Sequence, residues 1–146
     1  MGKLTDKNNE QVINAWEKAF AEKSPNAFAE ALSENVILEA AVLYCPILGR
    51  EKVKKVMSAA SNIYDSVTFT NYAYTDFKQY IEWEAKAFGD VMLAGITILT
   101  RNHDNSISHI AINHRPLGNG LRFSAVLGER LRGEIDSIHF YQILEQ

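Results

Sequence analysis

Residues 66–116 decide the fold, and they read SVTFTNYAYTD (66–76), QYIEWEAKAFGD (79–90), VMLAGITILTRNHDN (91–105) and SISHIAINHRP (106–116). These four runs are rich in Val, Ile, Thr, Tyr, Phe and Trp, and only turn-sized segments separate them. Consecutive antiparallel strands have this pattern. The sequence therefore predicts four neighbouring strands that form one sheet.

The turn at Gly89-Asp90 predicts how the second and third strands pair. A two-residue connection makes a tight hairpin. In that register Trp83 lies opposite Ile96, and both point to one apolar face of the sheet. The apolar side chains predicted on the outer face are Val67, Phe69, Leu93 and Leu99. A sheet with an apolar face must be covered by other elements, so we expect helices to pack on it.

Helical periodicity flanks the strands. Apolar residues recur every three or four positions in four segments, which are residues 6–22, 25–33, 50–64 and 117–132. Such spacing predicts amphipathic helices. Residues 35–48 are strand-like but irregular, and Pro46 places them at a sheet edge or in a loop. The tail is predicted to dock through Ile135, Ile138, Phe140, Ile143 and Leu144.

Composition limits the classes of function. The chain has 146 residues, of which 47% are hydrophobic and 23% charged, with a net charge of −3. These values predict a single domain over residues 1–146 and give no sign of nucleic acid as a partner. No run approaches the roughly 20 apolar residues of a membrane span, and no signal peptide is visible, so we expect a cytoplasmic protein without a membrane partner. Cys45 is the single cysteine, and the sequence predicts neither a metal site nor a cofactor.

The order of the predicted elements indicates an α+β architecture. N-terminal helices are expected to pack on a curved, mostly antiparallel sheet of four to six strands. Long twisted strands that wrap around helices leave a cone-shaped hollow, and an apolar hollow of this kind is the default ligand site.

Four motifs in the chain resemble the nuclear transport factor 2-like superfamily, in particular its SnoaL-like, polyketide cyclase-like branch. They are CPILGREKV (45–53), IEWEAKAFGD (81–90), DNSISHI (104–110) and HRPL (114–117). The resemblance covers roughly residues 8–116. It implies a cone-shaped α+β barrel and a homodimer that pairs through the outer face of its sheet.

The resemblance also implies an acid/base Asp a few residues after the turn that begins at Asp104. Counting along the strand places Ile112 near that position, and an isoleucine cannot transfer a proton. A shift of one residue would place Asn113 there instead. This departure argues against the standard chemistry of the branch.

Histidine is the remaining candidate for a catalytic group. His114 shares the strand alternation of Ile110 and Ile112, and His109 takes its place if the turn gains or loses a residue. Histidine can act as a general base near neutral pH, although a hydrogen-bonded structural histidine is the alternative interpretation. The residues predicted to contact a ligand are Trp16, Tyr44, Tyr64, Tyr72, Trp83, Ile96 and Ile112. Ordinary core packing is the alternative for these side chains.

Two hypotheses follow from the sequence. In the first, the cone binds a small, largely apolar molecule, with or without proton-transfer chemistry of an isomerase, cyclase or hydrolase type. In the second, the chain is a non-catalytic binding or dimeric assembly module whose own side chains fill the cone. The size of the cavity and the polar atoms that reach it distinguish the two.

Overall fold

The computed structural model describes residues 3–142, and side chains are described from Asp6 onward. Within this range the elements follow the order α1 (Lys3–Glu22), α2 (Pro25–Ala31), β1 (Leu32–Ala40), β2 (Ile47–Leu48), α3 (Arg50–Ile63), β3 (Tyr64–Tyr74), β4 (Lys78–Ala87), β5 (Val91–Arg101), β6 (Ile107–Arg115), α4 (Leu117–Arg130) and the 3-10 helix η1 (Ser137–His139).

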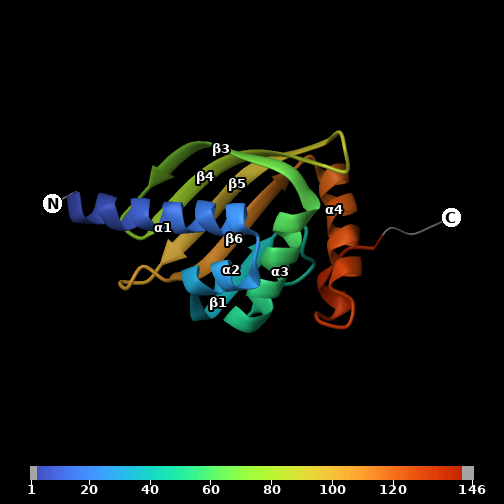
Figure 1. Cartoon of the computed structure of the whole chain (residues 1–146), viewed down its shortest axis with the longest axis horizontal. Helices are drawn as coiled ribbons and strands as arrows, with labels where there is room; N and C mark the ends of the chain where they lie inside the picture. Colours follow the sequence, from blue (N-terminus) through green and yellow to red (C-terminus); the bar gives the residue numbers. More distant parts are fainter. Residues whose placement is uncertain (1–2, 143–146) are drawn as a thin grey trace.

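The strands form one curved sheet in the order β2-β1-β6-β5-β4-β3. All neighbours pair antiparallel except β1 and β6, which are parallel. The helices lie on the concave side, with α1 along the sheet and α4 across one end (Figure 1). The predicted α+β class, with a curved and mostly antiparallel sheet, is confirmed.

The helices reach the sheet through the apolar stripes that the sequence shows. In α1 the buried residues include Val12, Trp16 and Ala19, which are at most 1% exposed. Ser24 caps α2 by accepting a hydrogen bond from the backbone N–H of Ala27 at 3.1 Å, and Pro25 occupies the first helical position. This is the predicted start of the second helix.

The predicted register of the β4–β5 hairpin is wrong by one residue. Ala87 pairs with Val91, so the loop has three residues, and both Phe88 and Gly89 adopt positive φ. Trp83 therefore lies opposite Gly95 instead of Ile96. A slip of one residue turns every side chain of a strand to the other face.

The slip inverts the predicted faces of β5. Leu93 and Leu99 were expected on the outer face, yet they are 1% and 0% exposed in the core. Val67 and Phe69 were also expected outside, and they line the interior of the cone instead. Ile96 points outward. The outer face of the sheet is apolar nonetheless, because Ile37, Met92 and Ile96 are 37%, 47% and 36% exposed.

Two other segments differ in part from the prediction. The irregular segment 35–48 contains most of β1, which is an inner strand between β2 and β6, and only β2 lies at the edge. In the tail, Ile135 and Phe140 are buried as predicted, whereas Ile138 is 61% exposed. The predictions for Ile143 and Leu144 lie outside the described residues.

A buried polar cluster closes one end of the cone, and we call it the arginine end. It consists of Asn9 on α1, Gln79 on β4 and Arg101 on β5, which are 0%, 0% and 6% exposed. Asn9 Oδ1 accepts hydrogen bonds from Gln79 Nε2 at 2.6 Å and from Arg101 Nε at 3.2 Å. Arg101 Nη2 donates to the backbone oxygen of Asp76 at 2.7 Å. These bonds fix the first half of α1 on the sheet.

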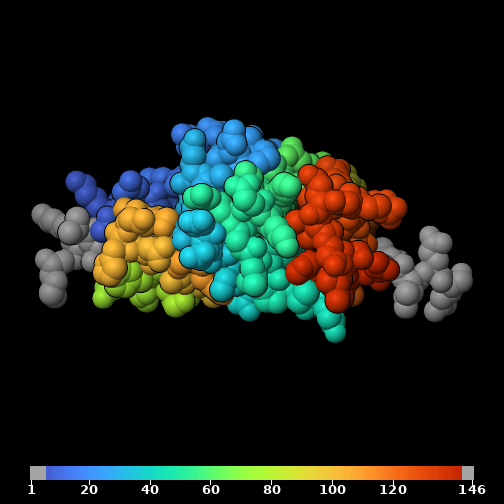
Figure 2. Space-filling view, turned by 90° about the horizontal axis from the view of Figure 1, so that it is seen from below, coloured from blue at the N-terminus to red at the C-terminus, as the bar shows by residue number. Residues whose placement is uncertain are grey.

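The opposite end of the cone lies under α4, and we call it the α4 end. Ser124 Oγ, which is buried, donates to the backbone oxygen of Val42 at 2.5 Å and accepts from the backbone N–H of Tyr141 at 2.9 Å. Figure 2 shows α4 and the segment after it covering this end, with the β5–β6 turn toward the other end. The two ends are thus closed by different means.

No helix within the described residues is long and apolar enough to cross a membrane. The cytoplasmic location stays a prediction of the sequence.

Candidate functional site

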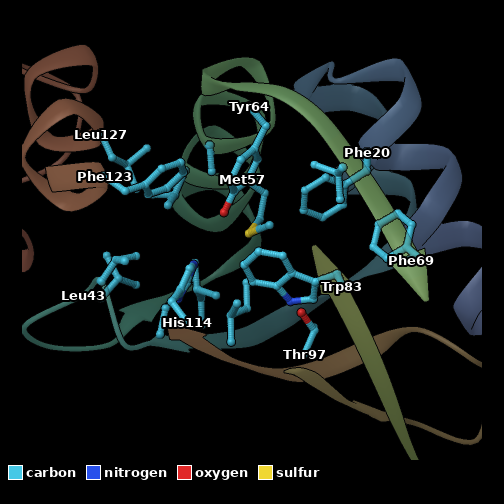
Figure 3. Close-up of a pocket in the computed structure, with 17 residues that line it drawn as sticks. Phe20, Leu43, Met57, Tyr64, Phe69, Trp83, Thr97, His114, Phe123 and Leu127 are labelled. Atoms are coloured by element: carbon cyan, nitrogen blue, oxygen red, sulfur yellow. The ribbon is translucent and has the colours of Figure 1, made fainter. Parts of the chain in front are cut away.

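A narrow cavity of about 30 Å³ lies inside the cone, between the sheet and α3. Its lining is almost entirely apolar and comes from α1, α3, α4 and five of the strands and their connections. Hydroxyl or imidazole groups enter the lining from Tyr64, Thr97 and His114. Figure 3 shows Met57 in the middle of this group, above the ring of Trp83.

Four aromatic rings close a circuit on the cavity wall toward α4. The Trp83 ring stands edge-on to His114, with centroids 5.5 Å apart, and His114 lies 6.1 Å from Phe123. Phe123 stacks on Tyr64 at 4.8 Å, and Tyr64 lies 6.0 Å from Trp83. Pairs of rings at such distances stabilise one another in addition to the area they bury. We call these four residues the aromatic cluster.

Gly95 makes room for the aromatic cluster. A Cβ atom at this position would lie 2.2 Å from the backbone oxygen of Asn113 and 2.8 Å from Cζ2 of Trp83. The missing side chain allows the indole of Trp83 to cross β5 toward His114, which is the partner of Gly95 on β6. A glycine inside a strand often marks such a close approach.

His114 carries the unusual polar atom of the cavity. Its Nδ1 is buried and has no hydrogen-bond partner among the described residues. Burial lowers the pKa of His114 to about 4, and the nearby backbone of Ile112 opposes part of that shift. The imidazole is therefore neutral at pH 7, with one ring nitrogen that no protein group satisfies.

Tyr64 and Met57 complete the interior. Burial raises the pKa of Tyr64, so its hydroxyl stays protonated and remains a hydrogen-bond donor. Met57 is 2% exposed and occupies the space above Trp83 (Figure 3). A methionine side chain has three rotatable bonds and adapts easily to a new neighbour.

The structure brings some of the predicted site residues together. Tyr64, Trp83, Ile112 and His114 all line the cavity. Trp16 does not, because it is buried behind the wall, with its ring 5.3 Å from Phe20. The ladder between β5 and β6 pairs His114 with Gly95, so His114 faces the cavity, as the strand alternation predicted.

The other predicted residues lie outside the cavity. Tyr44 is 66% exposed beside Tyr141, and Tyr72 is 47% exposed, with its hydroxyl donating to Glu17 Oε1. Ile96 points outward because of the hairpin register. His109 Nε2 lies 2.7 Å from Glu39 Oε2 at the surface, so it does not take the place of His114.

Sequence reasoning missed several lining residues. Thr97 points into the cavity because the hairpin register differs by one residue from the prediction, and for the same reason Ile96 points outward. Phe123 and Leu127 lie one helical turn apart on α4, and this spacing was the available signal. Met57 lies in the helix predicted over residues 50–64, but nothing in a sequence shows that a helix residue reaches the centre of a cone.

Comparison with known proteins gives structural matches alone. No family model matches the sequence, and no curated protein matches it either. An uncharacterized protein with a cystatin-like fold from Silicibacter pomeroyi superposes with a TM-score of 0.79 at 16% identity, over 84% of this chain and 86% of that chain. A steroid delta-isomerase from Pseudomonas aeruginosa gives 0.77 at 16% identity, over 86% and 92%. An NTF2-like protein of unknown function from Mesorhizobium loti gives 0.67 at 14% identity, over 75% and 93%.

The chain has the nuclear transport factor 2-like fold. This conclusion confirms the fold that the sequence motifs implied. Identities of this size establish the fold alone, and a nuclear transport factor 2-like fold carries many functions. Membership of the SnoaL-like branch stays a prediction.

Proposed function

We propose that this nuclear transport factor 2-like chain binds a small, largely apolar molecule in its cone and that His114 makes the polar contact. The observation that supports this is the unpaired Nδ1 of His114, buried beside an apolar cavity. A buried polar atom without a partner costs about 1–3 kcal/mol. A ligand that offers one hydroxyl group to Nδ1 would remove that cost while its apolar part replaces water.

The size of the cavity sets a condition on this proposal. A volume of about 30 Å³ holds about two water molecules, because each needs on the order of 10–15 Å³ of such space. A larger ligand therefore requires a side chain to move. Met57 is the side chain best suited to do so, since it lies centrally and is flexible.

The chemistry of the cavity favours binding over proton transfer. A general base works best when its pKa lies near the working pH. Burial lowers the pKa of His114 to about 4, which makes it a weak base at pH 7. No Asp or Glu side chain is among the described residues that line the cavity. Isomerase, cyclase or hydrolase chemistry would thus depend on His114 as its base, with only the hydroxyls of Tyr64 and Thr97 beside it in the described lining, and we assign His114 the contact role.

A matched pair of ligands tests the contact. p-Cresol and p-xylene have nearly the same shape, and one carries a hydroxyl where the other has a methyl. Titration calorimetry should show that the chain binds p-cresol more tightly, and His114→Leu should remove about two- to tenfold of that preference, the value of one hydrogen bond. Equal preference in both proteins would remove His114 from the site.

The second candidate function is a dimeric assembly module with a filled cone, and the small cavity volume favours it. If the wild-type chain binds neither ligand up to its solubility limit, this candidate replaces the first.

Both candidates share a proposed homodimer through the outer face of the sheet, where Ile37, Met92 and Ile96 are exposed. Sedimentation equilibrium should show a dimer that Ile96→Lys converts to a monomer. A monomeric wild-type chain would contradict this interface.

A further inference from the structure

A second hollow lies on the outside of the molecule, between α1 and β3. It is a surface groove of about 420 Å³, which we call the outer groove. Four residues, Phe20, Tyr64, Val67 and Phe69, line both the outer groove and the cone cavity. A single layer of side chains therefore separates the two spaces.

The shared layer is only partly buried. Phe20, Val67 and Phe69 each keep intermediate exposure while they line the cavity on their inner side. The rings of Phe20 and Phe69 meet edge to face with centroids 5.7 Å apart. Figure 3 shows this pair on the side of the cavity away from Phe123 and Leu127.

β3 is suited to move at this position. It is an edge strand that bonds only to β4, and its ladder is irregular between Phe69 and Asn71. Beyond the Phe20–Phe69 pair, the exposed hydrogen bond from Tyr72 to Glu17 links β3 to α1. Local opening is least costly where few apolar contacts and exposed hydrogen bonds hold an element.

The α4 end is held more firmly. A buried hydrogen bond joins Ser124 to Val42 and a partly buried one joins it to Tyr141, while the exposed Asn119 donates through Nδ2 to the backbone oxygen of Met92 at 2.7 Å. Gly128 packs so closely on Phe140 that an added Cβ would lie 2.9 Å from its side chain. Opening the α4 end would break buried bonds, whereas opening between α1 and β3 separates one ring pair.

The outer groove also differs from the cavity in polarity. Its lining includes the polar residues Glu17, Lys23, Asp65 and Ser66, whereas the cavity lining is almost entirely apolar. We propose that the outer groove is the entrance and the outer half of the cone site, and that the ligand is a slender apolar chain whose inner end carries the hydroxyl for His114 Nδ1 and whose outer end is a second polar group. The apolar chain passes between Phe20 and Phe69 into the cone, and the outer polar end stays in the groove. This inference rests on the proposed function of the cone.

The rate of binding tests the entrance. cis-Parinaric acid is a suitable probe because it is a slender polyene with one carboxylate and fluoresces in apolar surroundings. In stopped-flow experiments Phe69→Ala should raise its association and dissociation rates about tenfold each, which corresponds to about 1.4 kcal/mol less cost of opening. The dissociation constant should change much less than either rate.

Phe140→Ala is the matched control, because it removes the same ring at the α4 end without touching the cavity. It should leave the association rate within about twofold of wild type, since Phe140 lines neither the outer groove nor the cavity. Tyr72→Phe, a milder change at the surface, should accelerate entry slightly and covers the case in which Phe69→Ala does not fold. Faster entry in Phe140→Ala, or equal acceleration at both ends, would overturn the proposed entrance while leaving ligand binding intact. Absence of probe binding to a wild-type chain that binds p-cresol would overturn the inference and leave the proposed function in place.

The orientation of the ligand has its own readout. A stearic acid with a nitroxide next to its carboxylate should broaden the backbone amide signals of Lys23 and Ser66 and spare that of Leu127. Broadening at Leu127 with sharp signals at Lys23 and Ser66 would mean that the polar end enters first, and this would overturn the assignment of the outer groove.

Discussion

At the arginine end of the cone, Asn9 Oδ1 accepts hydrogen bonds from Gln79 and Arg101, although Gln79 Oε1 has no partner among the described residues. At the α4 end, aromatic and aliphatic side chains meet around a cavity that the unpaired Nδ1 of His114 adjoins. β5 runs from one end to the other, from Val91 under α4 to Arg101. The same strand thus supports a tightly bonded region and a loosely filled one.

The difference separates stability from binding. Directional bonds at the arginine end fix where α1 lies on the sheet, and their loss should unfold the chain. At the α4 end, contacts between apolar side chains tolerate small shifts, so this end can admit a guest. We therefore expect substitutions at the first end to change mainly stability and those at the second to change binding and the response to pH.

The largest effect is expected at the arginine end. Arg101→Leu should lower the free energy of unfolding by about 4 kcal/mol, because it leaves the buried Asn9 Oδ1 and the partly buried backbone oxygen of Asp76 short of a donor. Urea denaturation measures this. Arg115→Leu is the control, since Arg115 is exposed at the end of β6, and it should cost less than about 0.5 kcal/mol. Similar losses for both variants would show that the polar cluster has no special role.

The next effect concerns pH at the α4 end. The pKa of His114 is lowered from 6.5 to about 4 by burial, so the unfolded chain binds a proton more readily than the folded chain between these values. The stabilisation is complete above pH 6.5 and is lost as pH falls toward 4, by about 3 kcal/mol. His114→Leu should remove this part of the pH dependence.

The measurement is the free energy of unfolding at pH 8 and at pH 4 for both proteins. The same substitution at the exposed His103 is the matched control and should leave the wild-type difference in place. If wild type and His114→Leu lose equal stability on acidification, His114 is not buried as described.

A substitution at Gly95 tests the contact between β5 and the aromatic cluster. Gly95→Ala places a Cβ atom 2.2 Å from the Asn113 oxygen and 2.8 Å from Trp83, so it should cost about 2 kcal/mol and shift tryptophan fluorescence. Gly118→Ala on α4 is the control, because open space surrounds that position, and there alanine should stabilise the helix by up to about 1 kcal/mol. If both variants gained stability or both lost it, the close approach at Gly95 would be contradicted.

The smallest effect is expected at the seam between α1 and β3. The hydrogen bond to Glu17 raises the pKa of Tyr72 to about 12. Glu17→Gln should bring the pKa of Tyr72 back toward 10, followed by the NMR titration of its labelled ring, and should cost less than about 1 kcal/mol of stability. An unchanged titration would show that the two side chains do not meet in solution.

The sequence was sufficient for those features that depend on local periodicity. The alternation of Ile110, Ile112 and His114 placed the histidine on the inner face, and the spacing of apolar residues located the four helices. The register of β5 was beyond its reach, because it depends on Phe88 adopting φ of 55°. A bulky residue rarely takes this conformation, so no pattern marks it. Because of that single residue, Thr97 lines the cavity, whereas the prediction placed Ile96 there.

Long-range features were also invisible in the sequence. The pairing of β1 with β6 joins segments that lie far apart in the chain, and no local motif signals a parallel partner. The cavity volume depends on how Met57, Phe123 and Leu127 fill the space left by the sheet. Such packing follows from the three-dimensional arrangement and not from periodicity.

The parallel pairing of β1 with β6 also sets the order in which the chain can assemble. As synthesis proceeds from the N-terminus, β1 emerges early, but its permanent neighbour appears only after β3, β4 and β5. Until then β1 and the short β2 expose unpaired backbone groups of the kind that recruit strands from other molecules. We therefore expect residues 32–48 to need protection during synthesis, because the sheet can close only when β6 has left the exit tunnel.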